Sequence, residues 1–314
     1  MIIVRLRGRL GNHLFQYAMA RALALDRGAE VAFDLSHFYL KPYSCGLRGF
    51  ASTGRAAGPM EIGPLVMGAN LLTVSQLHLP GRVKPMAQAL SSKALSLDAR
   101  LRPRMHRLME RRDMIGFEQA TLEKAMSLPE DIYLDGFWQS ERYFLRHAAS
   151  IRQELTPQFP LSPAAQALAR EISSVDAVSL HVRRGDYVSL AGVQKVFGSC
   201  SLEYYAKGVD LMQRRYAHPH IYVFSDDIAW ARENLRYDVP MSYVSGTPGL
   251  SDREELALMS RCKGNIIANS TFSWWGAWLN PSPEKSVVAP GRWVSGGGME
   301  SKDVVPESWA RVSA

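Results

Sequence analysis

Cysteine is scarce in this chain, which has only three among its 314 residues, Cys45, Cys200 and Cys262. Their odd number and wide spacing exclude a disulfide framework and a cysteine-built zinc site, so we expect a reducing compartment. No apolar run approaches the roughly 20 residues that a membrane-spanning helix needs. The N-terminal stretch reads as a strand and a glycine turn rather than a signal peptide. We therefore expect a soluble cytoplasmic protein that is at most peripheral to a membrane.

Internal repeats and low-complexity tracts are also missing, and what remains is an ordinary globular composition with a basic balance. Hydrophobic residues make up 46% and charged residues 21%, which is enough apolar material for a sizeable core. The length suggests two domains. The net charge of +7 favours an anionic partner, which can be a nucleotide, a nucleic acid or a membrane surface.

The first half of the chain begins as an α/β unit and then loses its pattern. The predicted elements are a strand at 2–6, a helix at 13–26 and strands at 31–34 and 132–134. Between 39 and 128 we predict loops and short helices. Within it, 100–112 interleaves six arginines with apolar residues, which indicates either a solvated basic helix or a helix lying on an anionic membrane surface. After the last strand, Ser140 is expected to cap a helix.

The second half alternates strands and helices regularly after a proline-rich segment at 156–163, which is the best candidate for a domain linker. The expected strands are 177–183, 221–224, 241–244, 265–268 and 286–289. The expected helices are 202–216, 228–235, one opened by a capping box at 251–254, and one ending at 278. This alternation predicts a doubly wound parallel sheet. We therefore divide the chain into domains 1–160 and 161–314.

The most informative stretch, His-Val-Arg-Arg-Gly-Asp-Tyr, starts at His181 where a predicted strand ends. A guanidinium cannot shed its charge, so two arginines there are poor core material, whereas parallel sheets bind ligands at that end. The stretch predicts an anion site that best fits a phosphate or pyrophosphate. Because side chains alternate along a strand, we expect Arg183 and Arg184 to differ, one gripping the phosphate and one holding the loop through Asp186. The alternative is a structural arginine–aspartate pair.

A second candidate follows another predicted strand and opens a helix. Its residues are Asn269, Ser270, Thr271, Phe272 and Ser273. Free N–H groups and a partial positive charge make a helix N-terminus a suitable phosphate site. The alternative is an ordinary N-cap in front of a tryptophan-rich core helix.

Two shorter segments carry weaker signals. In the turn after the first strand, Gly11 allows close backbone approach and Asn12 can cap the helix or touch a ligand, although two spaced glycines are weak evidence. After the strand at 221–224, Asp226 and Asp227 are adjacent, so their carboxylates diverge. We prefer a helix cap plus a hydrogen bond to a ribose or base, and we predict no metal site.

Together these motifs resemble bacterial α-1,2-fucosyltransferases of glycosyltransferase family 11. The segments GRLGNHLFQYA, HVRRGDY, YVFSDD and NSTFSWWGAWL occur in the family's order. The likeness is strong over 177–293 and present at 3–24. The His-x-Arg-Arg-x-Asp pattern is shared with α-1,6- and protein O-fucosyltransferases, whereas the last segment is more specific. The first loop departs from the family pattern at Arg9, usually glycine, and at His13, usually glutamine.

The resemblance implies a GT-B-like fold with two Rossmann-like doubly wound domains facing each other across a cleft. Domain 161–314 would bind GDP-fucose and domain 1–160 would lie on the acceptor side. The implied reaction is an inverting transfer of L-fucose from GDP-fucose to the 2-hydroxyl of a terminal β-galactoside. No metal and no cofactor beyond the donor substrate is implied.

By motif position, the donor site would comprise Gly11, Asn12, Arg183, Arg184, Asp226, Asp227, Asn269, Ser270, Thr271, Phe272 and Ser273. Either arginine would stabilise the negative charge that builds on the β-phosphate. Asp186 and His181 are candidates for the base that takes the acceptor proton, and His13 is a weaker one. With a good leaving group, deprotonation can also be late and need no strong base.

The acceptor would belong to a surface polysaccharide such as a lipopolysaccharide O-antigen, and the basic stretch 100–112 would hold the enzyme against the inner membrane. The enzymatic alternative is another linkage or another GDP-sugar. From another class, the alternative is a basic nucleic-acid-binding protein. The sequence has no recognition-helix signature and no aromatic-and-basic strand pattern, so nucleic acid is not an expected partner.

Overall fold

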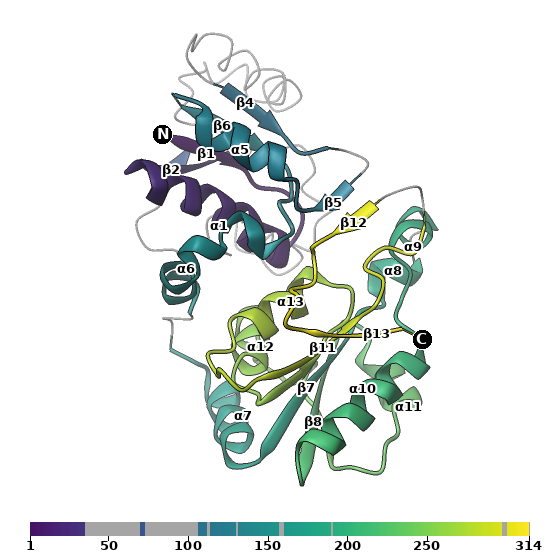
Figure 1. The fold of residues 1–314 in the computed structure, drawn as a ribbon. Helices are drawn as coiled ribbons and strands as arrows, with labels where there is room; N and C mark the ends of the chain where they lie inside the picture. Colours follow the sequence, from purple (N-terminus) through teal and green to yellow (C-terminus); the bar gives the residue numbers. More distant parts are fainter. Residues whose placement is uncertain are drawn as a thin grey trace, which may run out of the picture. The chain divides into compact units, whose positions relative to one another are not determined.

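The computed structural model describes residues 1–34, 70–72, 106–111, 114–129, 131–156, 160–189, 191–296 and 300–313. The chain divides into two compact units, 1–155 and 156–314. Each unit contains a parallel sheet with helices, which confirms the predicted α/β class (Figure 1). Within the described ranges, no helix combines the length and the apolar character needed to cross a membrane.

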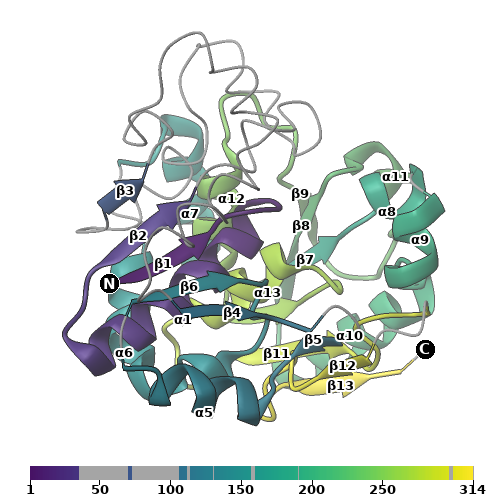
Figure 2. The same cartoon turned by 90° about the horizontal axis from the view of Figure 1, so that it is seen from above.

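The first unit has a five-stranded parallel sheet in the order β3-β2-β1-β6-β4 (Figure 2). Its strands are β1 (Ile2–Arg5), β2 (Val31–Asp34), β3 (Asn70–Leu72), β4 (His106–Met109) and β6 (Ile132–Asp135). Its other elements are α1 (Leu10–Arg27), β5 (Met114–Gly116), α5 (Gln119–Ser127), the 3₁₀ turns η5 (Glu141–Tyr143) and η6 (Leu145–His147), and α6 (Ala148–Leu155). Helix α1 packs on β1 and β2. It ends at Gly28, whose left-handed φ of 58° suits glycine.

Two expectations for this unit are wrong. The region 39–128 contains β3, β4 and β5 instead of only loops and short helices. The predicted basic helix at 100–112 is a strand at 106–109; residues 110 and 111 belong to no helix or strand, and residues 100–105 and 112 lie outside the described residues. The strand tolerates Arg107 because its guanidinium donates to Asp135 at 2.8 Å, while Leu108 is buried. Ser140 does act as a cap, but it opens the 3₁₀ turn η5.

The second unit has a six-stranded parallel sheet in the order β13-β11-β10-β7-β8-β9. Its strands are β7 (Asp176–Val182), β8 (Pro219–Ser225), β9 (Met241–Tyr243), β10 (Gly264–Ile266), β11 (Ser286–Pro290) and β13 (Ala310–Val312). A further short strand, β12 (Glu300–Lys302), lies outside this sheet. All five strands predicted for this half are present.

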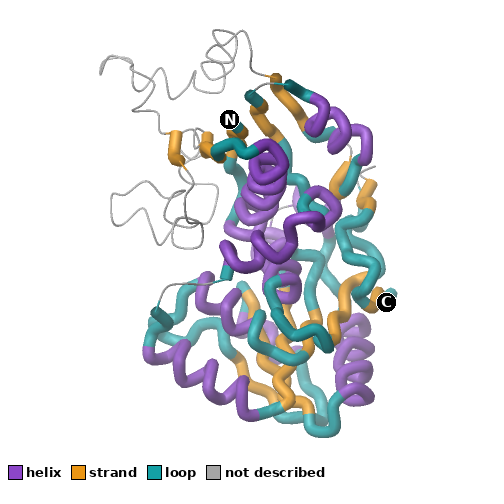
Figure 3. The backbone as a smooth tube through the Cα atoms, turned by 60° about the vertical axis from the view of Figure 1, so that its left-hand side comes forward, coloured by secondary structure: helices purple, strands orange, loops and turns teal. Residues whose placement is uncertain are grey.

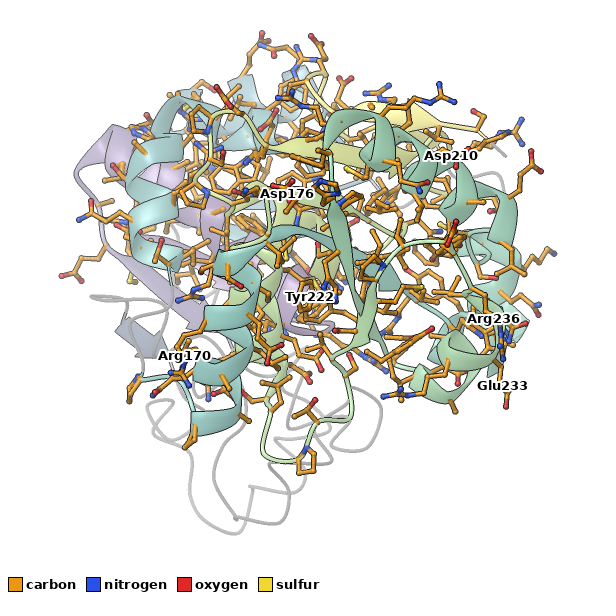
Figure 4. The ribbon with its side chains drawn as sticks, turned by 90° about the horizontal axis from the view of Figure 1, so that it is seen from below. Arg170, Asp176, Asp210, Tyr222, Glu233 and Arg236 are labelled. Atoms are coloured by element: carbon orange, nitrogen blue, oxygen red, sulfur yellow. The ribbon has the colours of Figure 1, made fainter. Side chains whose placement is uncertain are left out.

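Helices cover both faces of this second sheet, as predicted (Figure 3). The helices are α7 (Pro163–Ser174), α8 (Gly185–Ser189), α9 (Ala191–Phe197), α10 (Leu202–Arg215), α11 (Ile228–Asn234), α12 (Asp252–Met259) and α13 (Thr271–Trp278). One hydrophobic cluster joins α10 and α11 to one face, and another joins α7 and α12 to the other. Figure 4 shows Arg170 of α7 and Asp210 of α10 on opposite sides of Tyr222 in β8. Helices α7, α8 and α9 were not predicted.

Strand β7 lies where the order of the sheet reverses. From β7 the chain proceeds to β8 and β9 on one side, whereas β10, β11 and β13 lie on the other. Such a reversal opens a crevice at the carboxyl ends of the two central strands, where doubly wound sheets bind ligands. The sheet order therefore places the ends of β7 and β10 at the expected ligand position of this unit.

Helix α12 begins with the predicted capping box, in which Ser251 and Glu254 exchange hydrogen bonds. The Glu254 carboxylate also accepts the N–H of Ser162 at 2.6 Å, which ties the start of α7 to α12. Burial acts to raise the pKa of Glu254, but the hydrogen bonds from Ser162 and Ser251 prevail and lower it to about 2.

We expect Glu254→Ala to lower the free energy of unfolding at neutral pH by about 2 kcal/mol, because a cap and two further hydrogen bonds to a charged group are lost. The folded pKa lies below the ordinary value of 4.5, so the contribution of Glu254 is present above that pH and is lost as the pH falls toward 2. Urea unfolding at two pH values measures both effects. Exposed Glu233→Ala on α11 is the control, and an equal loss in both variants would contradict the prediction.

Candidate functional site

The predicted arginines stand directly after β7, and each is paired with an aspartate that follows β8. Nη1 of Arg183 lies 2.9 Å from Oδ2 of Asp226, and Nε of Arg184 donates to Oδ2 of Asp227 at 3.2 Å. The two arginine side chains keep 13% and 21% of their exposure, so both remain reachable. The predicted loop contact through Asp186 cannot be assigned, since that side chain lies outside those described. The structural arginine–aspartate pair is therefore present, but with different partners.

The parallel register of β7 and β8 produces these pairs. Val182 lies opposite Ser225, so the residues that follow the two strands meet across the sheet edge. The backbone N–H of Arg184 also donates to Oδ1 of Asp226 at 2.9 Å. A side chain on Gly185 would bring its Cβ within 2.6 Å of Oδ2 of Asp226, so glycine permits the close approach. Asp226 thus fixes both the chain and a guanidinium at this turn.

The Arg184 guanidinium also lies on an aromatic ring. Its central carbon is 3.9 Å from the ring centroid of Trp230 in α11, a cation–π distance. Asp227 is the N-cap of α11 and accepts the N–H of Trp230 at 3.2 Å, which confirms the predicted cap. Among the described residues, the terminal nitrogens of Arg184 make no hydrogen bond. The contacts with Asp227 and Trp230 hold the guanidinium in place, so these nitrogens can donate to a ligand.

The amino end of α13 lies beside this turn, at the other half of the switch point. Ser270 is the N-cap of α13 but makes no side-chain capping bond, which leaves the first N–H groups of the helix for other acceptors. Phe272 and His181 are in ring contact with centroids 5.7 Å apart, which places the end of β7 next to the first turn of α13. Thr271 is half-buried, and Ser273 is buried with its hydroxyl donating to the Ser270 carbonyl. Fixed guanidinium groups and a helix N-terminus therefore adjoin.

Asn269 belongs to the framework that supports this site. Its side-chain amide donates to the carbonyls of Phe197, Gly198 and Trp293 at 3.0, 3.2 and 3.3 Å. Its own carbonyl accepts the hydroxyl of Tyr187 at 3.0 Å. The hydrogens of the amide nitrogen are thus all engaged. Asn269 ties the segments around Tyr187, Phe197 and Trp293 to the end of β10.

His181 is buried and keeps only 4% of its exposure. Burial lowers its pKa from 6.5 to about 3, with Asp226 opposing the shift and the Arg183 charge adding to it. A lowered pKa weakens an imidazole as a proton acceptor near neutral pH, so the burial of His181 does not favour it as the general base. The other histidine candidate, His13, is fully buried in α1 of the first unit.

The remaining predicted donor residues lie in the first unit. Gly11 and Asn12 are in the first turn of α1, because that helix starts at residue 10 instead of 13, and the N-cap is Arg9. Asn12 does not cap the helix; its Oδ1 accepts the side-chain amide of Gln139 at 2.9 Å. Their predicted contact with the donor stays a prediction.

Sequence reasoning missed a chain of contacts behind the aspartates. The N–H of Ser225 donates to the hydroxyl of Ser245 at 2.9 Å, and that hydroxyl donates to Glu255 at 3.0 Å. Burial raises the pKa of Glu255 to about 7, and the nearby Asp252 adds to the shift against the hydrogen bond from Ser245. The one hint in the sequence was the position of Glu255 in the first turn of a capped helix. An acidic residue is common there because it interacts favourably with the helix dipole, so the position did not point to a functional role.

Among the described residues, no three or more histidine, cysteine, aspartate or glutamate side chains gather in a metal-binding arrangement. Asp226 and Asp227, the candidate pair in the sequence, face guanidinium groups instead. The arrangement at the switch point is suited to binding a diphosphate and to stabilising negative charge on it.

Comparison with known proteins agrees with the motif resemblance. The family model described as Glycosyl transferase family 11 matches residues 1–310. The Escherichia coli alpha-1,2-colitosyltransferase is 31% identical over 315 residues and covers 99% of each chain. The Escherichia coli O-antigen biosynthesis glycosyltransferase WbnK is 41% identical over 137 residues, which cover 43% of this chain and 44% of the relative.

A mouse protein, galactoside 2-alpha-L-fucosyltransferase Sec1, is 30% identical over 186 residues, which cover half of each chain. Among solved structures, the fucosyltransferase NodZ from Bradyrhizobium is similar with a TM-score of 0.44 and 16% identity, covering 89% of this chain and 93% of NodZ.

With GDP as the probe for a diphosphate, we expect Trp230→Leu to weaken binding about fivefold, because Arg184 loses a cation–π contact worth roughly 1 kcal/mol and keeps only its contacts with the aspartates. Isothermal titration with GDP measures the change, and Trp230→Phe should retain most of the affinity. Arg232→Gln, which removes an exposed charge from the same helix, is the matched control. Equal affinities for the leucine variant and the wild type would contradict this role.

Proposed function

Because the chain belongs to glycosyl transferase family 11, we propose that it transfers L-fucose from GDP-fucose to the 2-hydroxyl of a terminal β-galactoside, with inversion. The observation that carries the proposal is the pair of aspartate-held arginines beside the N-terminus of α13, at the switch point of the second sheet. A departing diphosphate needs positive charge that is already fixed where negative charge will develop.

In the proposed reaction, the acceptor hydroxyl attacks the anomeric carbon while the bond to the β-phosphate oxygen breaks on the opposite face. Negative charge builds on the leaving GDP, and each fixed donor is worth roughly 3 kcal/mol in comparable sites. We assign the β-phosphate to Arg184, since its terminal nitrogens are unused among the described residues. Arg183 and the first N–H groups of α13 complete the clamp, which makes a metal dispensable.

The acceptor proton need not be taken by a strong base. Burial lowers the pKa of His181, which weakens its case relative to Asp186 and His13, the other predicted candidates. Because GDP is a good leaving group, we propose that deprotonation is late and that the released proton can pass to the departing phosphate or to water.

A second donor is favoured by the relative that matches along the whole chain. The Escherichia coli protein is named an alpha-1,2-colitosyltransferase, and colitose is L-fucose without its 3-hydroxyl. A donor that carried colitose on GDP would differ from GDP-fucose in one sugar hydroxyl. The clamp at the switch point serves either donor, so the choice depends on the contacts of the sugar ring.

For the acceptor, we propose a galactose-containing surface glycan such as an O-antigen. The names of the mouse and WbnK relatives support this choice. We further propose that 161–314 binds the donor and 1–160 the acceptor; that the two face each other across a cleft stays a prediction. The contact with the inner membrane was expected from a basic helix at 100–112. Because 106–109 is a strand of the sheet, the described residues do not support that contact.

GDP release from GDP-fucose, measured with EDTA present against lactose and other β-galactosides, tests the reaction. We expect acceptor-dependent release that Arg183→Ala and Arg184→Ala each reduce by about 100-fold or more, because a charge donor to the leaving group is removed. Arg232→Ala is the control for general charge loss. Release that survives both substitutions would refute the arginine clamp, and failure to bind GDP-fucose would refute the donor.

A direct comparison of GDP-fucose with GDP-colitose tests the donor sugar. We expect GDP-fucose to have the higher kcat/KM by about 100-fold or more, because a site that hydrogen-bonds a substrate hydroxyl strongly rejects an analogue without it. The opposite preference would establish the colitosyl alternative with the same clamp.

A further inference from the structure

The first unit holds an unevenly charged group of side chains at the carboxyl edge of its sheet. Its members, which we call the arginine cluster, are Arg5, Arg7, Arg107 and Asp135. Nη2 of Arg107 lies 2.8 Å from the Asp135 carboxylate, and Nη1 of Arg5 and Nη2 of Arg7 each lie 3.5 Å from it. Since β6 lies between β1 and β4, its last residue meets arginines from both sides.

The charges of the arginine cluster do not balance among the described residues. Three guanidinium groups surround one carboxylate, and the nearby Glu110 compensates only in part, because burial raises its pKa to about 7 against two backbone hydrogen bonds. Within the part of the chain that the structure describes, the buried Nε atoms of Arg5 and Arg7 meet no hydrogen-bond partner. Surplus positive charge that is partly desolvated is costly until an anion meets it.

The cluster is open to a ligand. The side chains of Arg7 and Arg107 keep 31% and 39% of their exposure, whereas Asp135 keeps only 5%. An arriving anion would therefore meet the two exposed guanidinium groups, with the carboxylate buried behind them. Ligands of parallel α/β sheets bind at this carboxyl edge.

The loops around the cluster are tied together before any ligand arrives. The fully buried Gln16 accepts the N–H of Arg7 and donates to the carbonyl of Gly136, both at 3.1 Å. The Glu110 carboxylate accepts the N–H of Phe137 at 2.5 Å, and the Arg7 guanidinium lies 4.6 Å from that ring. Donors held in this way lose little entropy when a ligand binds.

We propose that the arginine cluster binds an anionic group of the glycan acceptor, a carboxylate or a phosphate. This inference rests on the proposed function and deepens it, since a wholly neutral galactoside would leave the surplus charge uncompensated. Guanidinium groups suit both anions, because their planar N–H donors match paired oxygen atoms.

Two matched pairs of acceptors test the proposal. Lactobionate carries a carboxylate where lactitol carries a hydroxymethyl group, and lactose 1-phosphate adds a phosphate to lactose. In the GDP-release assay, we expect one anionic member to have a KM about tenfold below that of its neutral partner, as one charge-assisted hydrogen bond provides. The pair that shows the gain identifies the anion. Arg107→Gln should remove the gain, because it takes away one of the two exposed guanidinium groups of the cluster.

Arg111→Gln is the matched control, because it removes the same charge from the same segment but its guanidinium pairs with Glu118 at 3.7 Å. It should keep the preference for the anion, and thermal unfolding checks that both variants fold. Calorimetric titration with lactobionate and lactitol reports binding even where no transfer occurs, so failure of the proposed function can be recognised separately. The absence of preference in both pairs, or its loss in Arg111→Gln as well, would overturn the inference.

Discussion

The second unit depends on the pairing of two arginines with two aspartates across β7 and β8. A guanidinium cannot lose its charge, so Arg183 and Arg184 can stand at the edge of an apolar sheet only beside fixed carboxylates. Seven residue pairs keep the two strands in parallel register up to Val182 and Ser225, and the charged residues follow directly. Asp226 binds both the backbone and a side chain of the turn, so the pairing shapes the loop as well as balancing its charge.

The two units place positive charge in different ways. In the second unit, Asp226 and Asp227 balance the two arginines, so the proposed binding of a diphosphate rests on directed N–H donors and the helix N-terminus rather than on net charge. In the first unit, the described side chains of the arginine cluster leave a surplus of positive charge around Asp135, and a field of this kind favours anions. Directed donors suit a leaving group whose charge changes during reaction, whereas surplus charge suits a ligand that is anionic throughout.

Prediction succeeded where local patterns were long and had one explanation. The strands of the second unit and the capping box of Ser251 and Glu254 were found because periodicity and cap chemistry act over a few neighbouring residues. It failed at 100–112, where alternating arginine and apolar residues fit a helix and a strand equally well until Asp135 is known to neutralise Arg107. The start of α1 was also misplaced, because its N-cap, Arg9, makes no side-chain capping bond and gives no local signal.

The residue order alone was therefore sufficient for the α/β class, for the two arginines at a strand end and for the hydroxyl-rich start of α13. These features follow from local periodicity and from the chemistry of single side chains. The partners of those side chains came from the folded arrangement. Arg184 meets Asp226 and Asp227 from 42 and 43 positions away. Such contacts arise from strand order and register, which no short stretch of sequence encodes, because they depend on how whole elements pack against one another.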